Sequence, residues 1–369
     1  GLVGVFLLKW AQKSKSPHRG LGKLFAWIVC GAGGLLVVGA LVQVVTLGYL
    51  RSQHPPSGEL IDVGGYRMHI LAEGEGGPGP TVVWIPGAHE QGLALYHLHA
   101  AVRGEVRSVL FDRPGTGWSD PGGFPRRTAT EARELARLLE RSGEQGPFIL
   151  VGHSYGGLLA TNFARRHPEQ TAAVVLLDAS PPDAFIYAPV YGSGALAELA
   201  RAADREGLAK VFGVWGLRGG AMAEPDSGLE ELLQRRDSLL ADVGEAMSAN
   251  RRRAATSFAA ASIFREFGAG EVTETAPDLV VYDGELGDLP VYVVIPDESA
   301  AGIVEPLGLG EAAAARAANF LDRARVRYLD VSSDARLIHT PSGTGHNFPY
   351  EVPEFVVELV LGVVAEVGG

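Results

Sequence analysis

The sequence has a single cysteine among 369 residues, and Cys30 lies inside a long apolar segment. One cysteine excludes an intrachain disulfide and a cysteine-based zinc site. His89, His97 and His99 form the one histidine cluster, but no acidic residue stands at helical spacing to them. We therefore expect no metal site. The turn at Gly115 and Gly117 lacks the third glycine and the helix start of a dinucleotide site, so no cofactor is expected either.

Acidic residues are absent from the first fifty positions, which hold five of the 32 basic residues. The remainder therefore carries all 43 acidic residues against 27 basic ones. Such an acidic body repels the phosphates of nucleic acids, and we exclude nucleic acid as a partner. The sequence carries no indication of an oligomeric state.

Charged residues are absent from residues 24–50. These 27 positions reach about 40 Å as a helix, more than the ~30 Å hydrocarbon layer requires. We expect a transmembrane helix here, between a basic tail at 1–23 and a linker at 51–57. The basic residues all precede the helix, which predicts a cytoplasmic amino terminus and a catalytic domain on the outer side of the membrane. A cleaved signal peptide and a buried soluble helix are the alternatives.

Apolar runs rich in β-branched residues alternate with helical segments from residue 58 onward. This alternation predicts an α/β fold with a mostly parallel, doubly wound sheet, formed by residues 58–180 and 289–369. Residues 181–288 contain helical patterns and no clear strand, which indicates an inserted helical cap. A hairpin is expected around Gly64 and Gly65. Further strands are expected at 81–86, 106–112, 148–151, 173–177, 291–295 and 335–339, and helices at 130–141, 155–166 and 353–364.

Ser154 is the candidate nucleophile. It lies at the centre of Gly152-His153-Ser154-Tyr155-Gly156, a G-x-S-x-G pattern between an expected strand and an expected helix. Small glycines allow the sharp turn that pushes the serine hydroxyl above the sheet, and the positive end of the new helix points at the site. The pattern in this context predicts nucleophilic catalysis by Ser154.

A serine nucleophile needs a base, because its own pKa leaves it unreactive at neutral pH. His346 is the candidate, since it follows the last expected strand and precedes the last helix, in the chain order serine, acid, histidine. His153 should point elsewhere if Ser154 occupies the tip of the turn. His167 lies at the far end of the following helix.

These motifs resemble the α/β-hydrolase superfamily over roughly residues 58–365. The segment WIPGAHE at 84–90 resembles the oxyanion loop of that superfamily, with Pro86 in place of the usual histidine, and LFDRPGTGWSD at 110–120 resembles its D-x-x-G-x-G-x-S turn. The resemblance implies that the backbone N–H groups of Ala88 and Tyr155 form an oxyanion hole, which stabilises a tetrahedral intermediate.

The acid of the triad has two main candidates. Asp178 ends the strand after the nucleophile helix, where some members of the superfamily carry the catalytic carboxylate. Asp297 follows the next strand, where most members carry theirs, but it comes earlier than the usual spacing. We favour Asp178 over Asp297, with Glu298 and Asp183 as minor alternatives.

A serine at this position argues against the haloalkane dehalogenases and epoxide hydrolases of the superfamily, which need a carboxylate nucleophile. We expect hydrolysis of a carboxylic ester through an acyl-enzyme on Ser154. An amidase, a peptidase or an acyltransferase would use the same groups. A non-catalytic, membrane-anchored binding protein on a hydrolase scaffold is the alternative from another class.

The expected partner is a small acyl substrate of apolar character. The cap is dense in apolar and aromatic residues, which either cover an apolar pocket or pack the cap onto the sheet. The basic run 251–253 is expected on a solvated helix face. The apolar residues in question are Phe185, Ile186, Tyr187, Val190, Tyr191, Val211, Phe212, Val214, Trp215 and Leu217.

Overall fold

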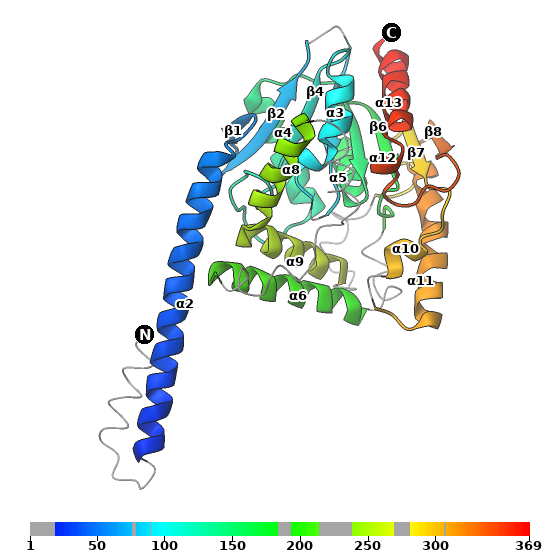
Figure 1. Cartoon of the computed structure of the whole chain (residues 1–369). Helices are drawn as coiled ribbons and strands as arrows, with labels where there is room; N and C mark the ends of the chain where they lie inside the picture. Colours follow the sequence, from blue (N-terminus) through cyan, green and yellow to red (C-terminus); the bar gives the residue numbers. More distant parts are fainter. Residues whose placement is uncertain are drawn as a thin grey trace.

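A computed structural model describes residues 19–75, 79–88, 90–183, 193–213, 238–268, 281–305 and 308–369. Within them one long helix, α2, precedes a body built on a central sheet (Figure 1). Most of the expected cap residues from 185 to 217 lie outside the described residues, and so does His89. Val211 and Phe212 lie inside them.

The described residues form a sheet of eight strands in the order β1-β2-β4-β3-β5-β6-β7-β8. Strand β2 pairs antiparallel with both β1 and β4. Every other neighbouring pair, from β4 to β8 along this order, is parallel. This confirms the predicted mostly parallel α/β sheet. The strands are β1 (Glu59–Asp62), β2 (Arg67–Glu73), β3 (Thr81–Ile85), β4 (Ser108–Phe111), β5 (Phe148–His153), β6 (Thr171–Leu177), β7 (Val291–Ile295) and β8 (Ala335–His339).

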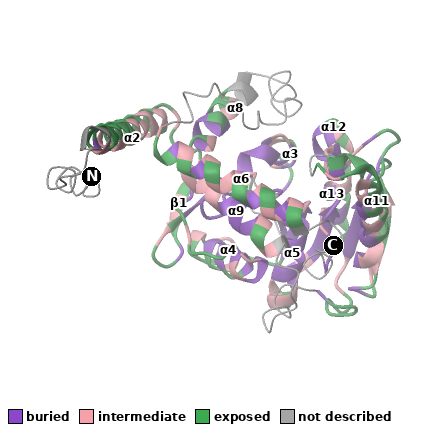
Figure 2. Ribbon diagram, turned by 90° about the horizontal axis from the view of Figure 1, so that it is seen from below, coloured by how far each residue is buried: buried purple, intermediate pink, exposed green. Residues whose placement is uncertain are grey.

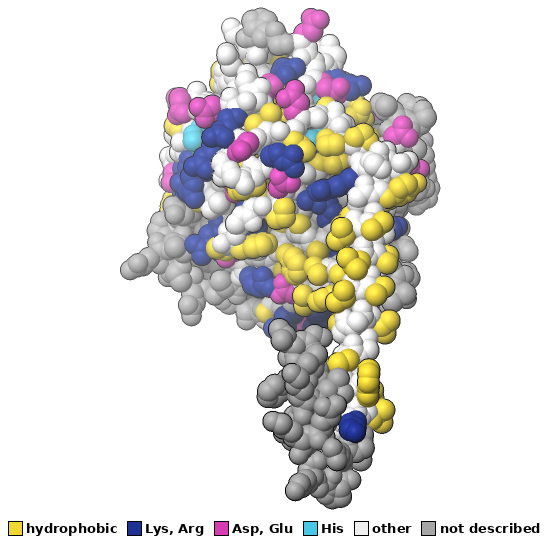
Figure 3. All heavy atoms as spheres, turned by 90° about the vertical axis from the view of Figure 1, so that its left-hand side faces the viewer, with side chains coloured by type: hydrophobic (Ala, Val, Ile, Leu, Met, Phe, Trp, Pro, Cys, Tyr) yellow, Lys and Arg dark blue, Asp and Glu magenta, His cyan; other side chains and the backbone are white. Residues whose placement is uncertain are grey.

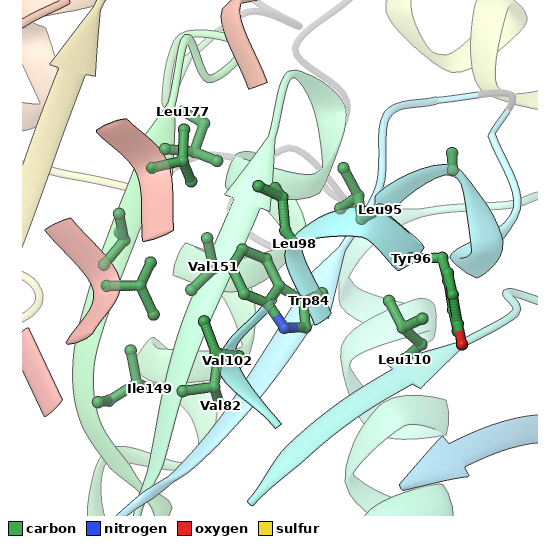
Figure 4. Packing of buried hydrophobic residues seen from close by; sticks show 14 of the residues in the cluster. Val82, Trp84, Leu95, Tyr96, Leu98, Val102, Leu110, Ile149, Val151 and Leu177 are labelled. Atoms are coloured by element: carbon green, nitrogen blue, oxygen red, sulfur yellow. The ribbon is translucent and has the colours of Figure 1, made fainter. Parts of the chain in front are cut away.

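Helices cover both faces of the sheet, as parallel strands require. On one face α3 and α13 pack over Trp84, which lies among Leu98, Val102 and Val151 (Figure 4). On the other face α4 and α5 enclose a second buried cluster. The bounds are α3 (Tyr96–Val102), α4 (Thr128–Ser142), α5 (Tyr155–Arg166), α12 (Phe348–Glu351) and α13 (Pro353–Gly368), with 3-10 turns η1 (Gly92–Leu95) and η2 (Pro168–Gln170).

Between β6 and β7 the described chain forms helices α6 (Ser193–Val211), α8 (Ser238–Arg251) and α9 (Ala254–Gly268). Helix α6 packs on α9, and the pair lies across one end of the body (Figure 1). Helix α9 contacts the core, because Thr256 Oγ1 donates to the carbonyl of Gly115 at 3.1 Å. Between β7 and β8 lie α10 (Ala301–Val304), α11 (Glu311–Ala324) and η7 (Arg325–Leu329).

Helix α2 (Arg19–Gln53) contains the apolar segment and is long and apolar enough to cross a membrane. Most of its side chains are exposed along its length (Figure 2). Its end is tied to the core, since Trp118 Nε1 donates to the carbonyl of His54 at 3.1 Å. A helix of this kind near an amino terminus fits either a membrane anchor or a signal sequence.

The prediction that residues 251–253 lie on a solvated helix face is wrong for Arg253. This side chain is buried and donates to the carbonyls of Gly117 and of Ser119, the latter at 2.7 Å. Burial and the nearby Arg51 lower the pKa of Arg253 to about 10. The arginine therefore fastens the cap, the helices between β6 and β7, to the glycine-containing turn after β4.

Candidate active site

Ser154 lies in a strained turn between β5 and α5. Its φ of 54° and ψ of −123° fall outside the regions that side chains usually adopt. The turn is possible because a Cβ at Gly152 would overlap the backbone of Gly156, and a Cβ at Gly156 would overlap the carbonyl of Ile85. The glycines of the G-x-S-x-G pattern thus permit the close packing that holds Ser154 at the tip.

His346 and Asp178 lie together at the carboxyl edge of the sheet. The distance from His346 Nδ1 to Asp178 Oδ2 is 2.6 Å, which is within hydrogen-bond range. Asp178 follows β6 directly and is 4% exposed. The ring of His346 also lies 4.7 Å from the ring of His153, which precedes Ser154. Residues 154, 178 and 346 are therefore brought to one region of the molecule.

The other candidate acids have different partners. Asp297 accepts a hydrogen bond from the backbone N–H of Gly343 at 2.9 Å, in the loop that carries His346. Glu298 is exposed, and its backbone N–H donates to Thr344. Asp183 is buried and pairs with Arg327. Of the four carboxylates, Asp178 contacts the imidazole of His346.

Arg325 is a site residue that sequence reasoning missed. Its Nε lies 2.8 Å from Asp178 Oδ1 and its Nη2 donates to Asp178 Oδ2 at 3.2 Å. Its Nη1 donates to Asp322 at 2.8 Å, and the side chain is buried. A buried carboxylate needs such compensation, because taking a charge out of water is costly unless it is paired and hydrogen-bonded.

Arg113 holds the loop that contains Ala88. Its guanidinium is buried and donates to the carbonyls of Pro86 at 3.0 Å, of Gly87, and of Ala88 at 2.7 Å. It also lies 5.1 Å from the centre of the Tyr155 ring. The carbonyl of Gly87 and the N–H of Ala88 belong to one peptide plane and point in opposite directions. Arg113 therefore fixes the direction in which the Ala88 N–H points.

Glu90 and His153 connect this loop to the loop of His346. Glu90 Oε2 accepts from the backbone N–H of Gly87 at 2.8 Å and lies 3.8 Å from His153 Nδ1. His153 Nε2 lies 3.0 Å from the carbonyl of His346. Burial lowers the pKa of His153, but Glu90, the His346 carbonyl and Asp178 together raise the pKa above its usual value.

Tyr155 opens α5, and its side chain extends into a buried polar cluster. Its hydroxyl donates to Glu131 Oε2 at 3.0 Å, and Glu131 pairs with Arg126 at 3.2 Å. Burial and the nearby Glu131 raise the pKa of Tyr155 well above its usual value, so the phenol stays protonated. These contacts anchor the first residue of the helix behind the nucleophile.

The fold of this chain recurs in known proteins. The model of the alpha/beta hydrolase family matches residues 82–359 of this chain. A thermophilic esterase from Thermogutta terrifontis superposes with a TM-score of 0.53 at 18% identity, over 84% of this chain and 98% of that chain. An epoxide hydrolase from Bacillus megaterium superposes with a TM-score of 0.55 at 14% identity, over 83% of this chain and 100% of that chain. At such identities these likenesses show the fold alone.

Sequence relatives match part of the chain. Lipase LipV of Mycobacterium tuberculosis is 37% identical over 111 residues, which are 30% of this chain and 41% of that protein. The chain spans about two fifths or less of the length of the first curated relatives it matches. The family match, in contrast, runs from β3 into α13 and includes Ser154, Asp178 and His346. The chain therefore belongs to the alpha/beta hydrolase family.

Proposed function

We propose that this hydrolase cleaves carboxylic esters through an acyl-enzyme on Ser154, with His346 as general base and Asp178 as the acid that orients it. The observation that carries the proposal is the 2.6 Å contact between His346 Nδ1 and Asp178 Oδ2, in a chain whose serine occupies a strained strand-to-helix turn. An Nδ1 proton held by a carboxylate leaves Nε2 unprotonated and able to accept the serine proton.

The proposed reaction has two balanced halves. Ser154 Oγ attacks the ester carbonyl as His346 Nε2 takes the hydroxyl proton, and the N–H groups of Ala88 and Tyr155 bind the resulting oxyanion. The C–O bond to the alcohol then breaks, and His346 returns its proton to the leaving alkoxide. Water attacks the acyl-enzyme with the same base and releases the carboxylic acid and free Ser154.

Two further residues act in the proposal without touching the substrate. Arg325 holds both oxygens of Asp178, and Arg113 orients the peptide unit that presents the Ala88 N–H. Both are positioning residues in this scheme. Amide hydrolysis and acyl transfer would use the same groups, so the proposed ester preference concerns the leaving group rather than the machinery.

A fluorophosphonate probe tests the nucleophile directly, because it phosphonylates activated serines. We expect the full-length protein in detergent to be labelled, and the Ser154→Ala variant to remain unlabelled. Failure of the wild-type protein to react, beside a control esterase that does react, would favour a non-catalytic binding protein. Equal labelling of both proteins would place the reactive serine elsewhere.

The substrate of the proposed esterase carries a medium acyl chain rather than acetate. The sequence places many apolar residues in the cap, and each buried methylene adds ~0.8 kcal/mol of binding that can be used in the transition state. We expect kcat/KM for p-nitrophenyl esters to rise from two to eight acyl carbons. A flat or falling series would mean that the apolar cap residues pack the cap onto the sheet and do not line a substrate pocket.

We also propose that residues 24–50 anchor the enzyme in a membrane, with a cytoplasmic amino terminus. Exposed apolar side chains along α2 support the anchor, and the basic residues before the apolar segment support this orientation. Protease added to intact cells, or to spheroplasts where an outer envelope exists, should digest the chain after residue 56. Protection before lysis and digestion after it would invert the orientation.

A further inference from the structure

Helix α2 contacts the cap halfway along its apolar segment. A Cβ on Gly39 would overlap the carbonyl of Phe212, and a Cβ on Gly213, whose φ is +66°, would overlap the carbonyl of Gly39. One turn later, Gln43 Nε2 donates to the carbonyl of Arg252 at 3.0 Å. Two glycines and an amide hydrogen bond therefore hold the end of α6 and the turn after α8 against the helix.

The position of this contact can be compared with the thickness of a bilayer. At 1.5 Å per residue, the twenty residues 24–43 already reach ~30 Å, the full depth of the hydrocarbon layer. The remaining residues 44–50 continue for about 10 Å beyond it. With the hydrocarbon layer beginning at Leu24, Gln43 lies at the boundary between hydrocarbon and headgroups, and Gly39 lies about 6 Å deeper. A cap docked at these two residues reaches the same boundary.

The end of α6 beside Gly39 exposes apolar side chains. Leu208 is 52% exposed, Val211 40% and Phe212 37%. Apolar side chains on α2 lie beside apolar side chains of the adjoining body (Figure 3). Farther from α2 the exposed side of α6 becomes charged, with Glu198 paired to Arg201 and Arg205. Helix α6 thus passes from an apolar end near α2 to a polar end away from it.

Such a helix fits the boundary of a bilayer. Helices that lie in the membrane interface bury apolar side chains about 5–10 Å deep, while arginine side chains extend toward the headgroups. Arg252 is exposed beside Gln43, so a basic group stands at the level expected for lipid phosphates, and Arg51 follows farther out in the last turn of α2. The depth of the contact, the apolar end of α6 and the basic groups all fit a lipid bilayer as the occupant of this surface.

We propose that the end of the cap formed by Leu208, Val211 and Phe212 is seated in the lipid bilayer, at the boundary of hydrocarbon and headgroups next to α2. The proposal rests on the proposed membrane anchor and is independent of the proposed reaction. It makes the enzyme a membrane protein through two surfaces, one spanning and one interfacial.

Depth-dependent fluorescence quenching tests the proposal without using activity. The full-length chain with Cys30→Ala receives one new cysteine at Leu208 or Phe212, each labelled with an environment-sensitive fluorophore. The protein is reconstituted in phosphatidylcholine vesicles that contain lipids spin-labelled near the headgroup or deep in the acyl chain. Leu36→Cys, in the middle of the span, is the embedded control. Leu337→Cys is the exposed control, because it lies on β8, at the edge of the sheet opposite to β1, the strand that follows α2.

We expect strong quenching at both cap positions by the shallow spin label and weaker quenching by the deep one. Leu36→Cys should be quenched best by the deep label, and Leu337→Cys by neither. Quenching at Leu36 without quenching at the cap positions would overturn the proposal and leave the anchor intact. No quenching at Leu36 would overturn both. Cap labels shielded from lipid spin labels and from aqueous iodide alike would mean that a protein covers this surface. Two cap positions, each checked by its thermal unfolding midpoint, guard against one variant that misfolds.

Discussion

Strands β6 and β7 are neighbours, both run in the same direction, and each is followed by an aspartate, yet the two carboxylates differ in every other respect. Asp178 is buried and lies between His346 and Arg325, while Asp297 is exposed and binds the backbone of Gly343. One carboxylate contacts the imidazole and the other holds the loop that carries it. Position at a strand end therefore does not decide which carboxylate contacts the imidazole, and the carboxylate that does is the one that is buried and paired with an arginine.

The largest expected effect comes from removing the proposed nucleophile or the proposed base, which the reaction needs whichever carboxylate orients the histidine. Ser154→Ala and His346→Ala should each lower kcat by roughly 10⁵-fold or more, because the proposed groups act as a unit. The double variant should be hardly slower than either single one. Ester hydrolysis with full-length protein in detergent measures this. Losses that multiply in the double variant would show that the two residues act separately.

Exchanging each aspartate for asparagine tests the comparison itself. Asp178→Asn should lower kcat by about 10⁴-fold, because an amide no longer holds the imidazole in the required tautomer. Asp297→Asn should cost about tenfold or less, since it weakens one backbone contact of an exposed side chain. Steady-state kinetics on the same ester gives both values. The opposite ranking would make Asp297 the acid and leave the proposed reaction unchanged.

Replacing Arg325 tests whether its pairing with Asp178 distinguishes this carboxylate from Asp297. Arg325→Met should lower kcat by roughly 10- to 100-fold, since hydrogen bonds to a charged group contribute about 1.5–3 kcal/mol. Arg325→Lys should recover part of the rate, because it restores the charge without the two-pronged geometry. The rate is expressed per fluorophosphonate-titrated serine. A purely structural role would reduce the number of titrated sites and leave kcat per site unchanged.

The smallest expected effect concerns His153, which lies between the oxyanion loop and His346. Its pKa is raised in the folded protein, so its stabilising contribution is fully present below the unfolded pKa of about 6.5 and is lost as pH rises through the folded pKa. The gap in thermal midpoint between wild type and His153→Gln should therefore be wider at pH 5.5 than at pH 8.5. A gap that is constant with pH would mean that the pKa of His153 does not change on folding, and a gap that narrows at pH 5.5 would mean that the folded protein keeps His153 neutral.

Local patterns predicted the strands well, because each buried parallel strand is a short run of β-branched residues. The segments 291–295 and 335–339 and the helix 155–166 match the structure residue for residue. Ser154 was found for the same reason, since the turn, the strand and the helix adjoin in sequence. Information within a window of a dozen residues was sufficient for these features.

The contacts around Asp178 have no such local signal. Arg325 lies 147 positions from Asp178, and His346 lies 168 positions from it. Only the pairing of β6, β7 and β8 brings them together, so periodicity and spacing left the acid open between Asp178 and Asp297. Arg253 was misjudged for the same reason, because a basic run on a helix looks solvated until the fold places carbonyls against it.

Helix α2 touches both parts of the body, and this has a mechanical consequence. Its end is hydrogen-bonded to the core through His54 and Trp118, and its middle is packed on the cap through Gly39 and Gly213. A helix with intact backbone hydrogen bonds is stiff over this length, so it acts as a brace between the two parts. Any motion that tilts α6 away from the sheet must break the glycine contact, bend the helix or tilt the helix with it. Movement of the cap is thereby coupled to the tilt of α2.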